Sequence, residues 1–224
     1  MGNKDIEMSK KTLSINLPRK SIVKNARHGR YRKTFLQSRI QGEMAELKFR
    51  DIIQRGGSNI TRSSLHANCF EHWDFNVKDN EGVICSGHSR YNLRNKGEEG
   101  EGTCMTTTPQ SWNIDVKSMK RISRKENEVQ DNYIWLELHG VRQGDKGWIY
   151  GGKADIIAFE VKEGFLLVLR SRLVQYVKNH VDMETHVKTP YEAVGKCYNR
   201  KNTADLLTLA TKEDIKKISL GIVS

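Results

Sequence analysis

A carboxylate and an amine share one face of an expected strand near the middle of the chain. Asp115 and Lys117 lie within "WNIDVKSMK" (112–120), where they alternate with Ile114 and Val116. Residues two apart in a strand point to the same side, so the charged groups lie together while the apolar pair enters a core. Such a charge pair on a sheet face costs free energy unless it has good bonding partners. A function of the two groups would be the other reason for their presence. A surface ion pair is one interpretation, and a metal-dependent nuclease site is the other.

Further carboxylates lie upstream, where a metal site would need them. Asp74 in "EHWDFNV" begins a strand-like run, and Glu71 is an alternative ligand three residues earlier. Glu43 in "QGEMAELKF" lies on an expected helix, and Glu46 competes for the same role about one turn later. Carboxylate oxygens are ligands that Mg²⁺ prefers, and Mg²⁺ can polarise a phosphodiester and acidify a water. The nearby Lys117 could position that water or stabilise charge in the transition state.

The elements that position these residues follow from the apolar spacing. Apolar residues at helical intervals predict a helix over 36–54, ended by Gly56 and Gly57. Three strand-like runs follow the polar segment 79–110, and the last of them splits at 162–164 into a hairpin.

The C-terminal part of the chain adds helices and a strand. Ser171 is a reasonable N-cap for a helix over "SRLVQYVKNHV", "DLLTL" predicts a strand, and Thr211 caps a short helix over "TKEDIKKI". The order predicts an α/β (α+β) domain with a mixed central β-sheet flanked by helices. We expect two parts, a basic N-terminal arm (residues 1–33) and a domain (residues 34–224) with an inserted loop or hairpin at about 79–110.

The combination of helix-borne Glu43, Asp74 and then Asp115-Val116-Lys117 resembles the PD-(D/E)xK nuclease superfamily, which includes restriction, homing and phage-type endonucleases. The resemblance covers roughly residues 36–180 and implies a restriction-endonuclease-like core. It implies that Asp74, Asp115 and Glu43 hold Mg²⁺, for which Mn²⁺ would substitute, and that Lys117 assists the water. The chain departs from the family pattern in two ways: Trp73 stands where a proline would precede Asp74, and about forty residues separate the two acidic motifs.

Glu137 in "IWLELH" is a further candidate for this site. It lies between Leu136 and Leu138, so it faces the cleft side of the sheet, or solvent, if these two leucines fill the core.

The charge of the chain favours a nucleic-acid partner. The formal net charge is +11, and residues 1–38 hold ten Lys and Arg against two acidic residues. A basic arm of this kind suits phosphate binding, although a solvated tail is the alternative. The expected DNA contacts are Arg27, Arg30, Arg32, Lys33, Lys120, Arg121, Arg200 and Lys201.

The cysteines raise a structural zinc alternative. Cys85 and His88 have the spacing of a zinc-ligand pair, and His66, Cys69 and His72 recur at steps of three. A second pair with regular zinc-ligand spacing is missing. Structural Zn²⁺ is bound by four nitrogen or sulfur ligands. The preferred interpretation is therefore that these Cys and His residues do not form a zinc site.

These observations predict a Mg²⁺-dependent DNA endonuclease acting in the cytoplasm of a bacterium or a phage-infected cell, possible as a homodimer and without a membrane span. A non-catalytic nucleic-acid-binding protein and an RNA-processing nuclease remain the alternatives.

Overall fold

The computed structural model describes residues 26–79, 110–141, 144–200 and 203–224, with the side chains of 26–35, 79 and 110 left out. Most of the predicted arm and insert therefore lies outside the described residues. The chain divides into two compact units, residues 1–36 and 37–224, and the fold below is that of the second. The long helix α1 (Ala26–Arg55) begins in the first unit and ends in the second.

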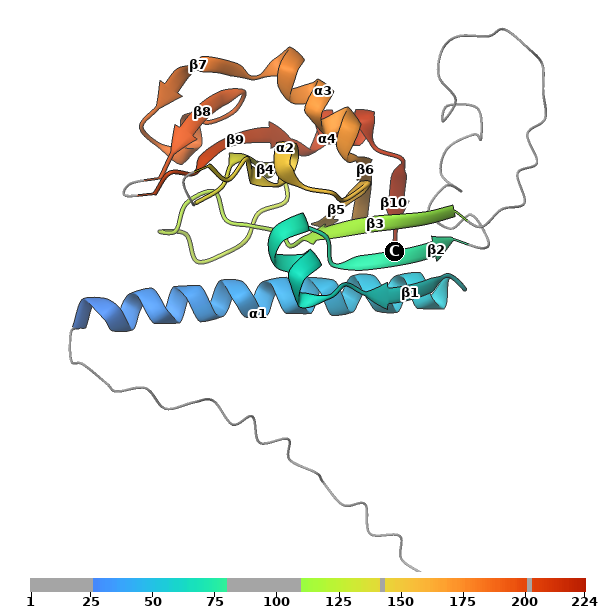
Figure 1. Cartoon of the computed structure of the whole chain (residues 1–224). Helices are drawn as coiled ribbons and strands as arrows, with labels where there is room; N and C mark the ends of the chain where they lie inside the picture. Colours follow the sequence, from blue (N-terminus) through green and yellow to red (C-terminus); the bar gives the residue numbers. More distant parts are fainter. Residues whose placement is uncertain (1–25, 80–109, 142–143, 201–202) are drawn as a thin grey trace, which may run out of the picture. The chain divides into compact units, whose positions relative to one another are not determined.

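Two mixed β-sheets form the second unit (Figure 1). In the six-stranded sheet, β3 and β5 are parallel and the other neighbours are antiparallel. Its order is β1 (Asn59–Arg62), β2 (Phe75–Asp79), β3 (Gln110–Lys117), β5 (Ile156–Val161), β6 (Gly164–Leu169) and β10 (Gly221–Val223). The four-stranded sheet has the order β4 (Tyr133–His139), β9 (Leu206–Thr211), β8 (Lys196–Asn199) and β7 (Asp182–Val187).

Both faces of the six-stranded sheet are buried. The C-terminal half of α1 covers one face, where Phe49 meets Phe165 edge-on at a centroid distance of 5.2 Å. The other face packs against β4 and the shorter helices, which are α2 (Gly147–Gly151), α3 (Arg170–His180) and α4 (Lys212–Ile218). This two-sided burial explains why "IIAFEV" and "GFLLVL" are almost continuously apolar.

Two short helical turns complete the described structure. The π-helical turn η1 (Ala67–Glu71) lies between β1 and β2, and the 3₁₀ turn η2 (Pro190–Glu192) precedes β8.

The predicted mixed α/β class is confirmed, and the details differ in three places. The sequence predicted one sheet, whereas the chain forms two. Helix α1 starts at Ala26, so residues 26–33 of the predicted arm are helical. The N-cap of α3 is Leu169, and Ser171 lies inside the helix, so that cap prediction was wrong.

Two local predictions are confirmed. Val161 pairs with Gly164 at the tip of the β5–β6 hairpin. The Asp214 backbone N–H donates to Thr211 Oγ1 at 3.1 Å, which caps α4.

Phe49 anchors α1 to the sheet, and truncating it should destabilise the fold. The side chain is fully buried, so we expect Phe49→Ala to lower the free energy of unfolding by about 3–5 kcal/mol. Met44, on the same helix and 61 % exposed, provides the matched control, and Met44→Ala should change it by less than about 0.5 kcal/mol. Urea denaturation followed by circular dichroism measures both values. Equal losses in the two variants would contradict this packing.

Candidate active site

The register of β2 and β3 places two aspartates opposite each other. Phe75 pairs with Ile114 at the end of the antiparallel ladder, and Asp74 and Asp115 follow directly beyond this pair. Directly opposite residues in an antiparallel pair share one face of the sheet. Ile114 lies in the core beneath α1, so both carboxylates point to the other face, as the alternation predicted for Asp115.

Asp74 is fixed at the start of β2 by three hydrogen bonds. Its backbone N–H donates to the Ile114 carbonyl at 2.8 Å. Its Oδ2 accepts from the Val116 backbone N–H at 2.7 Å, and its Oδ1 accepts from Asn68 Nδ2. The side chain is buried. These bonds hold the Asp74 carboxylate in one orientation against β3.

Asp115 is buried beside two charged neighbours. Its Oδ2 lies 2.7 Å from Lys117 Nζ, a close charge contact without the directed geometry of a hydrogen bond. Burial and the Asp74 carboxylate raise the pKa of Asp115 to about 7, although Lys117 opposes this. Asp115 is therefore partly protonated near neutral pH. A cation in contact with it would favour its ionised form.

Lys117 is the positive charge at the centre of this group. Its ammonium is 5.1 Å from the centroid of the Trp148 ring, which gives a cation–π contact. Burial opposes its charged form, but Asp115, Asp74 and, more weakly, Glu137 outweigh burial and raise the pKa of Lys117. The amine is therefore protonated throughout the physiological range. It can donate to an anionic oxygen or to water, but it is no general base.

The structure distinguishes the two glutamates of α1. Glu46 is coupled electrostatically to Asp74 and Lys117, and burial followed by the Asp74 charge raises its pKa. Its carboxylate accepts from Arg62 at 2.7 Å and is largely buried. Glu43 is half exposed and pairs with Arg39 at 2.9 Å along the helix surface. The structure thus couples Glu46, the alternative candidate, electrostatically to Asp74, and places Glu43 at the helix surface.

Two other predicted carboxylates lie at the margin of the site. Glu137 on β4 is half-buried, and burial raises its pKa while Lys117 lowers it. Glu137 is therefore coupled to Lys117 from the four-stranded sheet, and its part in the site stays a prediction. Glu71 accepts from Lys153 at 2.8 Å and from Trp73 at 3.0 Å. These bonds tie the end of η1 to the segment after α2.

Sequence reasoning missed two neighbours of the site. His72 has left-handed backbone angles, with φ 54° and ψ 59°. Burial and then the Lys117 charge lower the pKa of its imidazole, although Asp145 and Asp74 oppose this shift. Asn68 donates to Asp74 from within η1. The spacing of the sequence holds no signal for Asn68, because a π-helical turn has no characteristic pattern.

The predicted phosphate-binding residues fall into three groups. Lys120 is exposed beyond the end of β3. The Arg121 guanidinium donates to the Glu126 carbonyl at 2.8 Å, and Arg200 pairs with the fully buried Asp205, which neutralises it. Arg27, Arg30, Arg32, Lys33 and Lys201 lie where side chains are outside the described residues.

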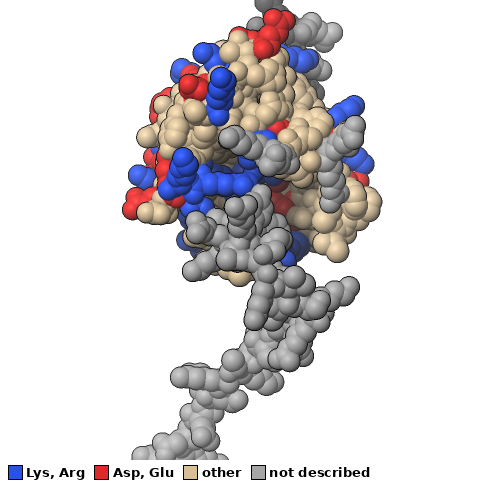
Figure 2. Space-filling model, turned by 90° about the vertical axis from the view of Figure 1, so that its left-hand side faces the viewer, with Lys and Arg blue, Asp and Glu red and all other residues tan. Residues whose placement is uncertain are grey.

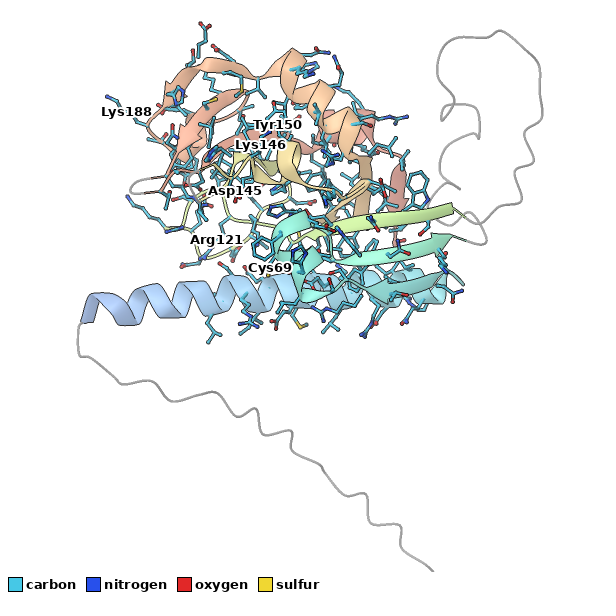
Figure 3. The ribbon with its side chains drawn as sticks, in the orientation of Figure 1. Cys69, Arg121, Asp145, Lys146, Tyr150 and Lys188 are labelled. Atoms are coloured by element: carbon cyan, nitrogen blue, oxygen red, sulfur yellow. The ribbon has the colours of Figure 1, made fainter. Side chains whose placement is uncertain are left out.

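Basic side chains lie on one face of the described structure. Figure 2 shows Lys and Arg side chains near the middle of this face, with acidic side chains close to them. Arg121, Lys146 and Lys188 lie toward this side in Figure 3. Lys146 and Lys188 are exposed, so with Lys120 they offer positive charge to a polyanion.

The donor atoms fit a hard divalent cation. Asp74 and Asp115 supply carboxylate oxygens on one face, where burial and the Asp74 charge raise the pKa of Asp115. Mg²⁺ usually binds proteins through one or two carboxylates and keeps several waters. Within the described parts of the chain, no three His, Cys, Asp or Glu side chains are grouped as a complete ligand set. Two aspartates with solvent and a substrate phosphate match the usual Mg²⁺ arrangement.

In the part of the chain that the structure covers, no set of Cys and His ligands is grouped for a structural zinc ion. Cys69 is an exposed free thiol and Cys197 a buried one. Cys85, His88 and Cys104 lie outside the described residues.

Comparison of the chain with protein-family models, with curated proteins and with solved structures gives no match. Among the described helices, none is long and apolar enough to cross a bilayer. The functional argument therefore depends on the geometry of Asp74, Asp115, Lys117 and Glu46.

The raised pKa of Asp115 should make the metal-free protein less stable as the pH rises. The unfolded chain releases this proton near pH 4 and the folded chain near pH 7, so the folded state binds more protons between these values. The contribution of Asp115 to stability therefore falls from about pH 4 to pH 7. Asp115→Asn should remove this fall and stabilise the protein at pH 8 by about 1–3 kcal/mol.

Urea denaturation in EDTA at pH 5.5 and pH 8 measures the effect. Asp51, an exposed aspartate of α1, provides the control, because Asp51→Asn should leave the pH dependence as in the wild type. If Asp115→Asn has a lower free energy of unfolding than the wild type at pH 8, then the ionised Asp115 carboxylate does not destabilise the folded protein.

Proposed function

We propose that this protein is a Mg²⁺-dependent DNA endonuclease of the PD-(D/E)xK type. The observation that carries the proposal is the placement of Asp74 opposite Asp115, with Lys117 in contact with Asp115 on the same face. This is the constellation that the family resemblance implies. The antiparallel β1–β2–β3 unit followed by the parallel β5 supports it, since the family core is a mixed sheet flanked by helices.

Each residue of the group has a distinct part in hydrolysis. Asp74 and Asp115 would hold Mg²⁺, which when bound polarises the scissile phosphate and lowers the pKa of a water. Lys117, kept protonated by its carboxylates, donates to the attacking water or to a phosphate oxygen as negative charge develops. Glu46 adds a third acidic group, coupled electrostatically to Asp74, and takes the role that the family resemblance implied for Glu43.

The surroundings of the site favour a polyanionic substrate. The net charge is +11, and Lys120, Lys146 and Lys188 are exposed near the end of β3 or on the same side of the molecule (Figures 2 and 3). Positive charge near a nucleic acid releases counterions and supplies affinity without sequence preference. A binding protein without catalysis would need this charge but not two buried aspartates beside a lysine.

Cleavage of plasmid DNA with Mg²⁺ or Mn²⁺ tests the proposal directly. Wild-type protein should nick or cut the plasmid, and EDTA should abolish cleavage. Asp115→Ala and Lys117→Ala should each lower the rate at least ~100-fold while DNA binding is retained. DNA binding without cleavage under either ion would favour the non-catalytic alternative, and cleavage of RNA alone would favour the RNA-processing one. Full activity in both variants would remove the site.

The two glutamates of α1 offer a matched pair of variants on one helix. Glu46→Gln should lower the cleavage rate about 10- to 100-fold, because it removes a carboxylate coupled to Asp74. Glu43→Gln should leave the rate within about twofold, since Glu43 pairs with Arg39 at the surface. Initial rates at saturating Mg²⁺ and a Mg²⁺ titration of each variant measure the effect. The reverse order of effects would return the role to Glu43.

The N-terminal segment before α1 should contribute to DNA affinity through charge. Residues 1–25 include six basic residues and two acidic ones. Deleting them should make the negative slope of log K against log salt less steep, by at most ~5 for six phosphate contacts. Fluorescence anisotropy with duplex DNA over a range of salt gives the slope. An unchanged slope would show that this segment lies away from the DNA.

A further inference from the structure

The segment between β1 and β2 holds the catalytic aspartate on one side and exposes apolar side chains on the other. Its centre is the π-helical turn η1, which carries the exposed Cys69 in Figure 3. Such turns are rare and often occur at functional sites. Leu65 is 81 % exposed and Phe70 is 62 % exposed. These are the two most exposed large apolar side chains among the described residues.

The turn is fixed in place by its contacts with the site. Asn68 donates to Asp74 Oδ1, and Ala67 is buried. The Glu71 carbonyl accepts from the Lys153 backbone N–H at 2.7 Å, and the Glu71 carboxylate binds Lys153 Nζ at 2.8 Å. The exposed apolar groups therefore belong to a segment that is bonded at both its centre and its end.

Phe70 lies within reach of nucleotides near the scissile phosphate. Asp74 is the fourth residue after Phe70, so their Cα atoms are at most ~14 Å apart. Stacked bases are about 3.4 Å apart along one strand, so Phe70 lies no farther than about four nucleotides from a phosphate bound at Asp74. His66 lies against Phe70 with ring centroids 5.0 Å apart, which limits the directions that the phenyl ring can take.

We propose that Phe70, supported by Leu65 and His66, stacks on an unpaired base beside the scissile phosphate. The preferred substrate is then DNA with unpaired bases next to the cleavage point, not a fully paired duplex. Aromatic side chains grip single-stranded DNA by stacking on bases, and apolar side chains act as wedges between base steps. In a fully paired duplex the base faces are covered by their neighbours. The basic side chains near the site supply the accompanying phosphate contacts.

This inference rests on the proposed function only for the position of the scissile phosphate, and it is tested by binding. The full-length Asp115→Asn variant in EDTA is titrated with a paired duplex and with the same duplex carrying a short single-stranded gap. Phe70→Ala should weaken binding to the gapped DNA about 5- to 30-fold and leave the paired duplex within about twofold. Phe70→Trp should retain gapped-DNA binding. Met44→Ala, which removes another exposed apolar side chain, should change neither.

A 2-aminopurine base in the gap gives a second readout, because stacking on Phe70 quenches its fluorescence and Phe70→Ala restores it. Equal weakening on both DNAs, or no change on either, would overturn the stacking role. A wild-type protein that cleaves no DNA but keeps a Phe70-dependent preference would remove the nuclease proposal and support this inference. A wild-type protein that cleaves both DNAs alike, unaffected by Phe70→Ala, would overturn this inference and leave the nuclease proposal intact.

Discussion

The site depends on two carboxylates being held against each other in a buried position. Asp74 and Asp115 face each other because β2 and β3 pair in one register. A slip of one residue would turn Asp115 into the core beneath α1 and expose Ile114. The register is therefore secured by hydrophobic burial: Ile114 and Phe75 are both buried in the core that α1 covers. The charge pair costs free energy, and the apolar pair on the opposite face offsets it.

The four-stranded sheet and α2 give the charged face its low-dielectric surroundings. Trp148 of α2 lies against Lys117, and Glu137 of β4 is coupled to the same ammonium. Without this layer the aspartates would be hydrated, and the pKa of Asp115 would stay near its usual value. The second sheet thus sets the electrostatics of a site whose two aspartates and lysine come from the first sheet and its adjoining segments.

Sequence patterns predicted features that depend on neighbouring residues in the chain, such as strand faces and helix caps. They missed features that depend on tertiary packing. The alternation in β3 identified the face of Asp115 and Lys117, and Thr211 was identified as a cap because its hydroxyl acts on its own helix. The choice between Glu43 and Glu46 depends on which side of α1 meets the sheet, and either residue fits a helical repeat. The edge strand β7 is exposed along nearly its whole length, so it has no alternation to detect.

The segment between β1 and β2 determines both the orientation of the Asp74 carboxylate and the position of the exposed Phe70. Asn68 orients Asp74, and His72 takes left-handed backbone angles that redirect the chain from η1 into β2. Non-glycine residues hold such angles only where the surroundings enforce them, and here the Glu71–Lys153 contacts and the Asp74 ladder bonds do so. A change in the turn would therefore move the Asp74 carboxylate as well as Phe70. The position of the exposed aromatic ring and the position of the Asp74 carboxylate are set by one short, mutually bonded segment.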